Sequence, residues 1–457
     1  MMFIEIITFS SVNADNSTTP LFESRNITIN ITGTTKDSVE INEVDKSWPN
    51  NEVIFNGWGH NISYEYGEGE IWYWDVIWNR SYDVWYTPAL AVGDLDPDVE
   101  GVEVVDGLYQ LFVISYNNTT QSWNATMIWD PWTQDQGTVR TVKIGDFDPR
   151  HSGNELFCCT YGGLIREFYK AENGTWMMEV IDDTHTGKAY EECDIGDFDP
   201  RFEGNECVVF TEENLTMYAW NGSGWYWEEI HVKSYAKHMM CGRVGEVLPG
   251  NNESEIICGD TDGMLWIIWW NNTSYANKEI WINTSSFILA VAIGDCWSGH
   301  EGNEIVAGAY EECYLVWEEN GTWKKELIFK APQWEYITDL EIGEFDTLHP
   351  GNEIAVACGE LFELYEEIPV RESSGYWLGY IVLLICPVVV VWKWRENKGA
   401  TITQKGIERK KPYLALLASV RGNYEGRISL CGQNTIRGSV SSHQRNPRLQ
   451  SVFQPGQ

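Results

Sequence analysis

The chain has 457 residues and carries 68 Asp and Glu against 31 Lys and Arg, for a formal net charge of −37. The charge is uneven, because residues 393–457 hold 12 of the Lys and Arg residues and only 3 of the Asp and Glu residues. A surface as acidic as that of residues 1–392 repels phosphate backbones, which argues against nucleic acid as a partner. It is compatible with divalent cations, with a salty medium or with solubility alone.

The first segment, residues 1–14, has the sequence MMFIEIITFSSVNA. It ends in a small-residue pattern, Val12 and Ala14, that suits cleavage of a signal peptide after Ala14. Its apolar run is short, and Glu5 interrupts it. The sequence therefore predicts a weak or truncated signal peptide.

Residues 26–367 repeat one motif seven times. Each copy has a β-branched residue, usually a Gly, then an acid, and a Glu ten residues after the Gly position. The Gly positions are 49 to 52 residues apart: Asn42, Gly93, Gly145, Gly196, Gly245, Gly294 and Gly343. A fixed period near 50 residues indicates a stacked or circular array of similar units.

Each unit contains four short runs rich in Val, Ile, Tyr, Trp and Phe, separated by Gly, Asn and Asp. Such runs predict four antiparallel strands, the composition of a propeller blade. Asn-Gly pairs begin at Asn173, Asn221 and Asn320, between the third and fourth runs of three units. They predict two-residue hairpins at the outer rim.

The two ends of the array complement each other. The seventh unit supplies strands at residues 336–343, 352–359 and 361–367 and lacks a fourth. Residues 26–32 precede the first unit, with Ile27, Ile29 and Ile31 alternating. The sequence thus predicts an all-β fold, a seven-bladed β-propeller of four-stranded blades closed by an N-terminal strand, because closure removes unpaired sheet edges. An open row of blades is the alternative.

A single membrane anchor is predicted after a juxtamembrane linker at residues 368–375. Residues 376–392, YWLGYIVLLICPVVVVW, are 17 residues without a charge, near the short end for a spanning helix. Lys393, Arg395 and Lys398 follow at once, and positive residues stay on the cytoplasmic side. This predicts a single-pass surface protein with its N-terminus outside and a basic, disordered cytoplasmic tail at residues 393–457.

N-glycosylation sequons agree with that orientation. Sixteen N-x-S/T sequons precede the apolar segment and none follows it. Their asparagines are Asn16, Asn26, Asn30, Asn61, Asn79, Asn117, Asn118, Asn124, Asn173, Asn214, Asn221, Asn252, Asn271, Asn272, Asn283 and Asn320.

Cysteine and tryptophan are both abundant, with 11 Cys and 24 Trp. No CxxC or other metal-ligand spacing occurs, which argues against zinc. We expect the nine Cys before the apolar segment to be buried apolar residues, with one or two inter-blade disulfides as the alternative. We expect most Trp to pack blade on blade, with stacking on sugar rings as the alternative.

The acidic loops are the candidate metal sites. Carboxylates at alternate loop positions, followed by a later Glu, are how a protein wraps a calcium ion. The candidate ligands are Asp94, Asp96 and Glu103 in the second unit, Asp146, Asp148, Asn154 and Glu155 in the third, and Asp197, Asp199, Asn205 and Glu206 in the fourth. The alternative is structural: the same acids accept backbone N–H bonds and tie the loop between its strands.

These units resemble the FG-GAP and VCBS repeats of integrin-α-type propellers, whose GDxDxDGxxD loops bind calcium. The motif here, for example IGDFDPRHSGNE from Ile144, is one residue longer and lacks the third loop Asp and its Gly. The fifth and sixth units have Leu248 and Trp297 in place of the second acid. The resemblance implies a seven-bladed fold, and calcium as the cofactor.

Two classes of function are compatible with these features. The first is recognition or adhesion at the cell surface by a glycosylated propeller that binds a protein or a glycan. The second is an extracellular carbohydrate-active enzyme, a polysaccharide lyase or hydrolase, on the same scaffold. No GxSxG, HExxH or isolated carboxylate pair is present, which favours recognition. His151, His300 and His349 fall in the acidic loops, where we expect them to be exposed to solvent.

Overall fold

The computed structural model describes residues 21–366 with internal gaps at 27–37, 45–47, 49, 57–58, 69–70, 85–88, 135, 185–189, 212–213, 231–237, 252, 282–285 and 350. All of these residues belong to the first of two units of the chain, Met1–Pro369. The predicted signal peptide, linker, membrane segment and tail lie outside the described residues. Within the described part, no helix is long and apolar enough to span a bilayer.

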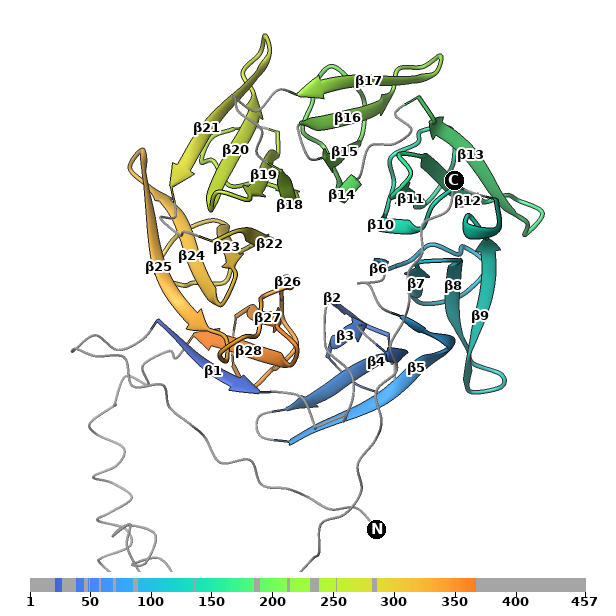
Figure 1. Cartoon of the computed structure of the whole chain (residues 1–457), viewed down its shortest axis with the longest axis horizontal. Helices are drawn as coiled ribbons and strands as arrows, with labels where there is room; N and C mark the ends of the chain where they lie inside the picture. Colours follow the sequence, from blue (N-terminus) through green and yellow to red (C-terminus); the bar gives the residue numbers. More distant parts are fainter. Residues whose placement is uncertain are drawn as a thin grey trace, which may run out of the picture. The chain divides into compact units, whose positions relative to one another are not determined.

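Seven four-stranded antiparallel sheets form a ring of blades (Figure 1). Blade 1 is β2 (Ser38–Asn42), β3 (Glu52–Asn56), β4 (Gly59–Glu68) and β5 (Ile71–Val84); blade 2 is β6 (Ala89–Gly93), β7 (Glu103–Gly107), β8 (Leu111–Asn117) and β9 (Ser122–Trp129). Blade 3 is β10 (Val139–Gly145), β11 (Glu155–Thr160), β12 (Ile165–Lys170) and β13 (Trp176–Asp182); blade 4 is β14 (Tyr190–Gly196), β15 (Glu206–Thr211), β16 (Leu215–Trp220) and β17 (Trp225–Ile230). Blade 5 is β18 (Met239–Gly245), β19 (Glu255–Asp260), β20 (Met264–Trp270) and β21 (Tyr275–Trp281); blade 6 is β22 (Ile288–Gly294), β23 (Glu304–Ala309), β24 (Glu312–Glu319) and β25 (Thr322–Lys330). Blade 7 is β26 (Asp339–Gly343), β27 (Glu353–Ala357), β28 (Leu361–Glu366) and β1 (Phe22–Asn26), and a single 3-10 turn, η1 (Trp132–Gln134), follows blade 2.

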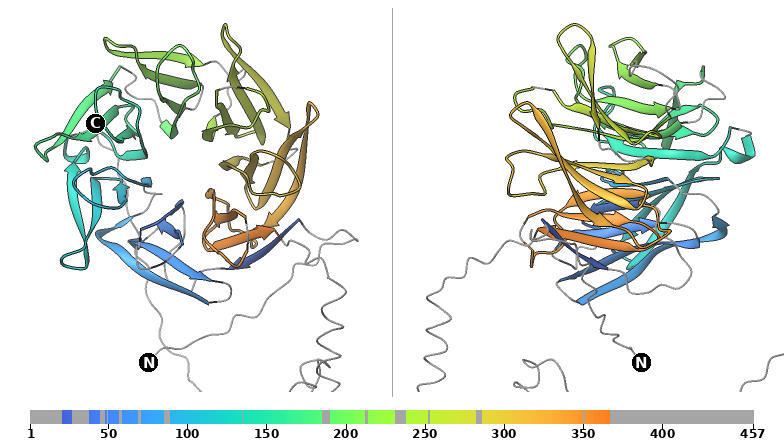
Figure 2. Two further views of the ribbon diagram at one scale, coloured as in Figure 1. Left: turned by 180° about the vertical axis from the view of Figure 1, so that it is seen from behind. Right: turned by 60° about the vertical axis from the view of Figure 1, so that its left-hand side comes forward.

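The first strand of each blade lies innermost, and the first strands of neighbouring blades contact each other around the ring (Figures 1 and 2). The repeated Gly belongs to this contact. A Cβ on Gly196 would lie 2.5 Å from Val244 Cγ1 of the next blade, so no larger side chain fits without movement. Gly343 of blade 7 faces Ile41 of blade 1 in the same way, so the packing continues through the point of closure.

The hydrophobic core lies between blades. One buried cluster, for example, joins Phe198 and Phe210 of blade 4 to Ile256 and Trp266 of blade 5. Because each blade covers its neighbour's apolar face, a single blade has no core of its own. This explains why the strands carry β-branched and aromatic residues on both faces, as the fully buried β11 does.

Closure by an N-terminal strand is confirmed, with a correction to its position. The closing strand is β1, which pairs antiparallel with β28 from Phe22 opposite Glu366 to Asn26 opposite Phe362. The predicted strand at residues 26–32 shares only Asn26 with β1, and residues 27–32 lie outside the described part. The apolar alternation of Ile27, Ile29 and Ile31 suggested the wrong segment, whereas β1 is anchored mainly by one buried aromatic residue, Phe22.

The hairpin prediction holds for one of three sites. Asn320 and Gly321 are the only residues between β24 and β25, and both have positive φ (53° and 81°), as a two-residue hairpin requires. The other two turns are longer, at residues 171–175 and 221–224. In the second of these turns the Asn side chain accepts backbone hydrogen bonds, because Asn221 Oδ1 accepts the N–H groups of Ser223 and Gly224.

Candidate functional site

The repeated Glu ties each acidic loop to its blade. All seven Glu side chains are buried, and each stands at the start of a second strand. In blade 4, Glu206 Oε2 accepts the backbone N–H groups of Phe198 (3.0 Å) and Asp199 (2.9 Å). The same two-bond contact is made by Glu103, Glu155, Glu255, Glu304 and Glu353, and Glu52 accepts the N–H of Val44.

The Asn before that Glu connects neighbouring blades. Asn154 Nδ2 donates to the Asp94 carbonyl of the preceding blade (2.7 Å), and Asn205 donates to the Asp146 carbonyl (2.7 Å). Asn303, Asn352 and Asn51 make the same bond to Glu246, Asp295 and Glu344, so the last of them joins blade 1 to blade 7. Asn154 and Asn205, predicted as metal ligands, thus use their side-chain N–H groups to link blades.

The second acid of the loop is buried and paired with a cation of the protein itself. Asp148 accepts from Arg150 Nε (2.8 and 2.9 Å) and Nη2 (2.5 Å), and Asp199 is bound in the same way by Arg201. The Lys170 ammonium lies 2.5 Å from Asp96 Oδ2 and 3.3 Å from Asp98. Side-chain cations of the protein therefore pair with the aspartates that the sequence predicted as calcium ligands.

The first acid points away from the others. Asp94, Asp146 and Asp197 are exposed to solvent, while Asp96, Asp148 and Asp199 are buried. The structure therefore does not gather Asp146, Asp148 and Glu155 around one centre, nor Asp197, Asp199 and Glu206. Their oxygens are engaged by N–H groups and guanidinium groups, which does not fit an oxygen cage for calcium. Calcium binding by these loops stays a prediction from the repeat pattern.

Burial raises the pKa of the tying glutamates. The pKa of Glu103 and that of Glu155 rise to about 7 and that of Glu206 to about 8, chiefly because burial disfavours the charged carboxylate. The nearby loop carboxylates, Asp197 and Asp199 for Glu206, add to the rise, and the two backbone N–H bonds oppose it.

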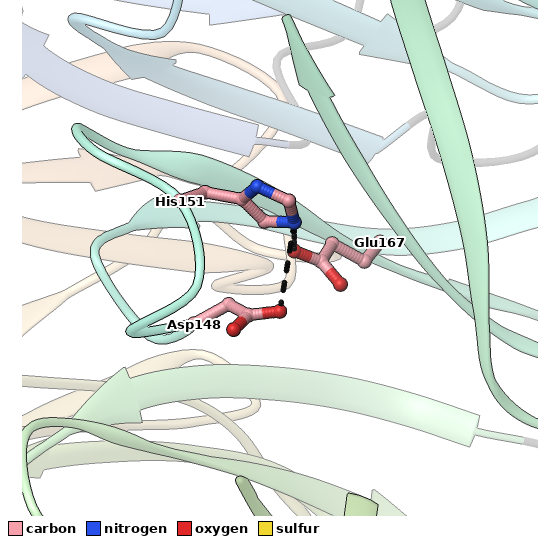
Figure 3. A group of neighbouring side chains, drawn as sticks. All are labelled: Asp148, His151 and Glu167. Carbon is pink, nitrogen blue, oxygen red and sulfur yellow. Dashed lines mark ion pairs between the residues drawn. The ribbon is translucent and has the colours of Figure 1, made fainter. Parts of the chain in front are cut away.

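A different set of side chains converges in blade 3 (Figure 3). Asp148 and His151 come from the acidic loop and Glu167 from the middle of β12. His151 Nε2 lies 3.8 Å from Asp148 Oδ2 and 3.7 Å from Glu167 Oε1. Burial and the charge of Asp148 raise the pKa of Glu167 to about 9. Tyr169 stacks on the His151 ring, with centroids 3.6 Å apart.

Blade 7 repeats this arrangement. His349 Nδ1 lies 3.0 Å from Asp346 Oδ2 and 3.7 Å from Glu363 Oε1, and its ring stacks on Tyr365. The expectation that His151, His300 and His349 are exposed was wrong, since all three side chains are largely covered. Part of this arrangement could have been found in the sequence, because the histidine follows the second loop Asp by three residues in both blades. The third member could not, because Glu167 and Glu363 come from a different strand of the blade.

The nine Cys residues before the apolar segment are free and buried, which confirms the expectation of small apolar residues over disulfides. The tryptophan side chains differ in burial. Trp72 packs on Phe345 across the blade 1–blade 7 contact, as expected, whereas Trp74 and Trp132 are exposed.

Several exposed or half-buried aromatic residues lie on the face of the ring opposite the acidic loops. This aromatic face comprises Tyr109, Trp132, Tyr161, Trp334 and Tyr336, which lie in turns between second and third strands or in connections between blades. Trp132, Tyr161 and Trp334 are 58%, 61% and 73% exposed. Tyr109 and Trp132 line a surface pocket with Gln110, Asp130 and Thr133.

No family model matches this chain, and no curated protein matches it. Among solved structures, it is similar to BBS1N, crystallised in complex with ARL6DN, at 8% sequence identity and a TM-score of 0.52, over 77% of this chain and 98% of that one. It also aligns with the WD40 repeats of RRP9 at 11% identity and a TM-score of 0.49, over 75% of this chain and 97% of that one. At 8% identity the likeness to BBS1N shows the fold alone, a β-propeller.

Proposed function

We propose that this chain is a glycosylated single-pass cell-surface protein whose propeller lies outside the cell and recognises a protein or glycan ligand. The segregation of sequons carries the proposal. All sixteen precede the apolar segment at residues 376–392, and the basic residues follow it. The repeats' resemblance to FG-GAP and VCBS units adds a precedent for propellers in that setting.

The placement of the sequon asparagines supports glycosylation. Wherever the structure describes their side chains, they are exposed or half-buried. Blades 2 to 6 each carry at least one in or directly beside the turn between the third and fourth strands: Asn117 and Asn118, Asn173, Asn221, Asn271 and Asn272, and Asn320. A glycan attached at a rim turn disturbs no inter-blade packing.

The rim turns and the aromatic face lie at opposite ends of the strands. In an antiparallel meander, the turn after the third strand lies at the same end as the turn after the first. The contact of Lys170, at the end of β12, with Asp96 and Asp98 of the neighbouring acidic loop is consistent with this. Of the sequon asparagines with described exposure toward the aromatic side, Asn26 and Asn214 are half-buried, and Asn79, in the second half of β5, is exposed. Glycans at the rim therefore leave the aromatic face open to a ligand.

A protein ligand suits such a face well. Tyr and Trp are enriched at protein interfaces because they bury a large area at low entropic cost. BBS1N, a propeller of the same fold, was crystallised with a protein partner. Aromatic rings also stack on sugars, so a glycan ligand uses the same surface.

Expression of the full chain with a C-terminal epitope tag tests the orientation. We expect endoglycosidase to lower the apparent mass and the tag to be reached by antibody only after permeabilisation. A tag that is accessible on intact cells, or a mass that endoglycosidase leaves unchanged, contradicts the proposal.

Substitution of the aromatic face tests the site of recognition. Cells displaying the protein are screened against a protein library and a glycan array, and hits are repeated with Trp132→Ala/Trp334→Ala. We expect binding to fall at least tenfold in this variant, while Asn173→Gln/Asn320→Gln, at the other end of the strands, retains it. Equal loss in both variants would argue against the aromatic face.

A further inference from the structure

The Asp–His–Glu set of blade 3 contains two buried polar atoms without a hydrogen-bond partner. Glu167 Oε1 and His151 Nε2 are both enclosed, and they face each other across 3.7 Å. That distance is too long for a hydrogen bond. Buried polar atoms are ordinarily satisfied, so such a pair requires an explanation.

The spacing suits two ligands of one metal ion. Ligand atoms bound at about 2.0–2.2 Å to a tetrahedral ion lie about 3.3–3.6 Å from each other. His151 Nε2 is 3.7 Å from Glu167 Oε1 and 3.8 Å from Asp148 Oδ2, slightly longer than these ligand separations. All three atoms lie within 4.8 Å of one another. Figure 3 shows the three side chains converging.

The set occurs a second time, which argues against chance. Asp346, His349 and Glu363 of blade 7 lie within the same limit of one another. Glu167 and Glu363 occupy equivalent positions in the strand register. They pair with Phe157 and Ala355, and each of these partners lies two residues after the repeated Glu of its blade. Glu363 Oε1 is also buried without a hydrogen-bond partner and lies 3.7 Å from His349.

We propose that these two sets are twin binding sites for a divalent transition-metal ion, with one imidazole nitrogen and two carboxylate oxygens as protein ligands in each. An imidazole ligand favours zinc, or its neighbours in the first transition row, over calcium, which takes oxygen ligands. The His151 and His349 side chains are 21% and 26% exposed, so each site lies just below the surface.

The neighbouring arginine is compatible with the ion. In blade 3, Arg150 is shared by Asp148, Glu167 and Glu179, at 2.5, 3.3 and 2.9 Å. Three carboxylates then balance one guanidinium and one divalent ion. In blade 7 the corresponding guanidinium is Arg25 of the closing strand β1, which pairs with Asp346 and Glu363. The blade 7 site therefore lies beside the closing strand.

Two other blades provide natural controls. Blade 4 keeps Asp199 and Arg201 but has Phe202 in the histidine position and Met217 opposite Val208, in the Glu167 position. Blade 6 has a loop histidine, His300, whose two ring nitrogens are already bonded to Glu304 and to the Glu318 carbonyl (2.8 Å each). Among the described residues, in neither blade does a ring nitrogen lie between two carboxylates, as His349 Nδ1 does between Asp346 (3.0 Å) and Glu363 (3.7 Å).

The test measures zinc bound to the full-length protein, purified without a histidine tag, stripped with EDTA and dialysed against ZnCl2. We expect two zinc ions per chain, one in His151→Phe and none in His151→Phe/His349→Phe. His300→Phe should retain two. Glu167→Met, which copies blade 4, should retain one. Excess CaCl2 should displace none.

The wild-type protein should also melt at a higher temperature with zinc, and the double variant should not. Circular dichroism of the metal-free variants confirms that they are folded. The proposal is overturned if the wild-type protein keeps no zinc, so that the arginines alone occupy these sites. It is equally overturned if the double variant keeps as much zinc as the wild type, or if calcium displaces it.

Discussion

At the scale of single residues, the repeated Glu is explained by hydrogen bonding rather than by ligand chemistry. A loop that leaves a first strand and turns into a second buries backbone N–H groups that no strand pairs. One carboxylate oxygen satisfies two of them, as Glu206 does for Phe198 and Asp199. In blades 2 to 7, a single side chain therefore replaces two ladder bonds.

Glu206→Ala should destabilise the protein by about 2 kcal/mol or more, since two buried N–H groups lose their acceptor. Glu206→Gln keeps an acceptor oxygen and should cost less than about 1 kcal/mol. Urea unfolding of the two variants measures the difference. If both variants lose the same stability, the two N–H bonds do not stabilise the loop.

Calcium can be tested at the same residues. Bound calcium would stabilise the fold by mass action, by about 2.7 kcal/mol at a hundredfold excess over its Kd. Because Arg150 and Arg201 occupy Asp148 and Asp199, we expect calcium and EGTA to leave the melting temperature unchanged. A calcium-dependent rise that Asp146→Ala/Asp197→Ala abolishes would instead establish the predicted calcium sites.

At the scale of elements, ring closure depends on a five-residue strand, β1. Its Phe22 is 3% exposed and packs in the cluster that joins blades 6 and 7. Its Arg25 reaches Asp346 and Glu363, so one side chain neutralises buried acids while the backbone covers the edge of β28. Short as it is, β1 joins the two ends of the repeat array.

Phe22→Ala should cost about 3–5 kcal/mol, the usual loss for a buried aromatic residue. Ser24→Ala, at an exposed position of the same strand, should change stability by no more than about 0.5 kcal/mol. Thermal melts of both variants give the comparison. A melt of Phe22→Ala that matches wild type would show that closure does not depend on β1.

At the scale of the whole molecule, several of the few cations among the described residues pair with acids inside the propeller. Besides Arg25, Arg150, Arg201 and Lys170, Lys143 pairs with Glu40 (3.1 Å) and Arg243 with Glu192 (2.6 Å) on the inner strands. The outer surface is therefore left strongly acidic. The buried glutamates, whose pKa is raised toward neutral pH, also make the stability of the propeller depend on pH.

Stability should fall as the pH rises from about 5 to 9. The pKa of Glu206 is about 8 in the folded protein against an ordinary 4.5, so its contribution is complete below pH 4.5 and is lost as the pH approaches 8. Glu103, with a folded pKa of about 7, behaves likewise. Melting temperatures across this range measure the slope, and Glu103→Gln/Glu206→Gln should flatten it by up to about 1.4 kcal/mol per group and pH unit. If the slope is unchanged in this variant, the pH dependence of stability arises from repulsion between surface carboxylates and not from these two buried glutamates.

The sequence by itself determined the repeat, the four strands per blade, the number of blades and closure from the N-terminus. These follow from spacing and local pattern, because strand alternation, turn residues and a 50-residue period are properties of consecutive residues. The position of the closing strand was missed, since Phe22 is recognised only by what it packs against.

The tertiary structure alone decided the chemistry of the loops. Asp146 and Asp148 are two residues apart, yet one faces solvent and the other is buried against Arg150. Glu167 joins Asp148 and His151 although it comes from another strand, and Arg25 reaches Asp346 from the other end of the chain. Which carboxylates share a site depends on burial and on strand register, and both arise only when the blades pack into a ring.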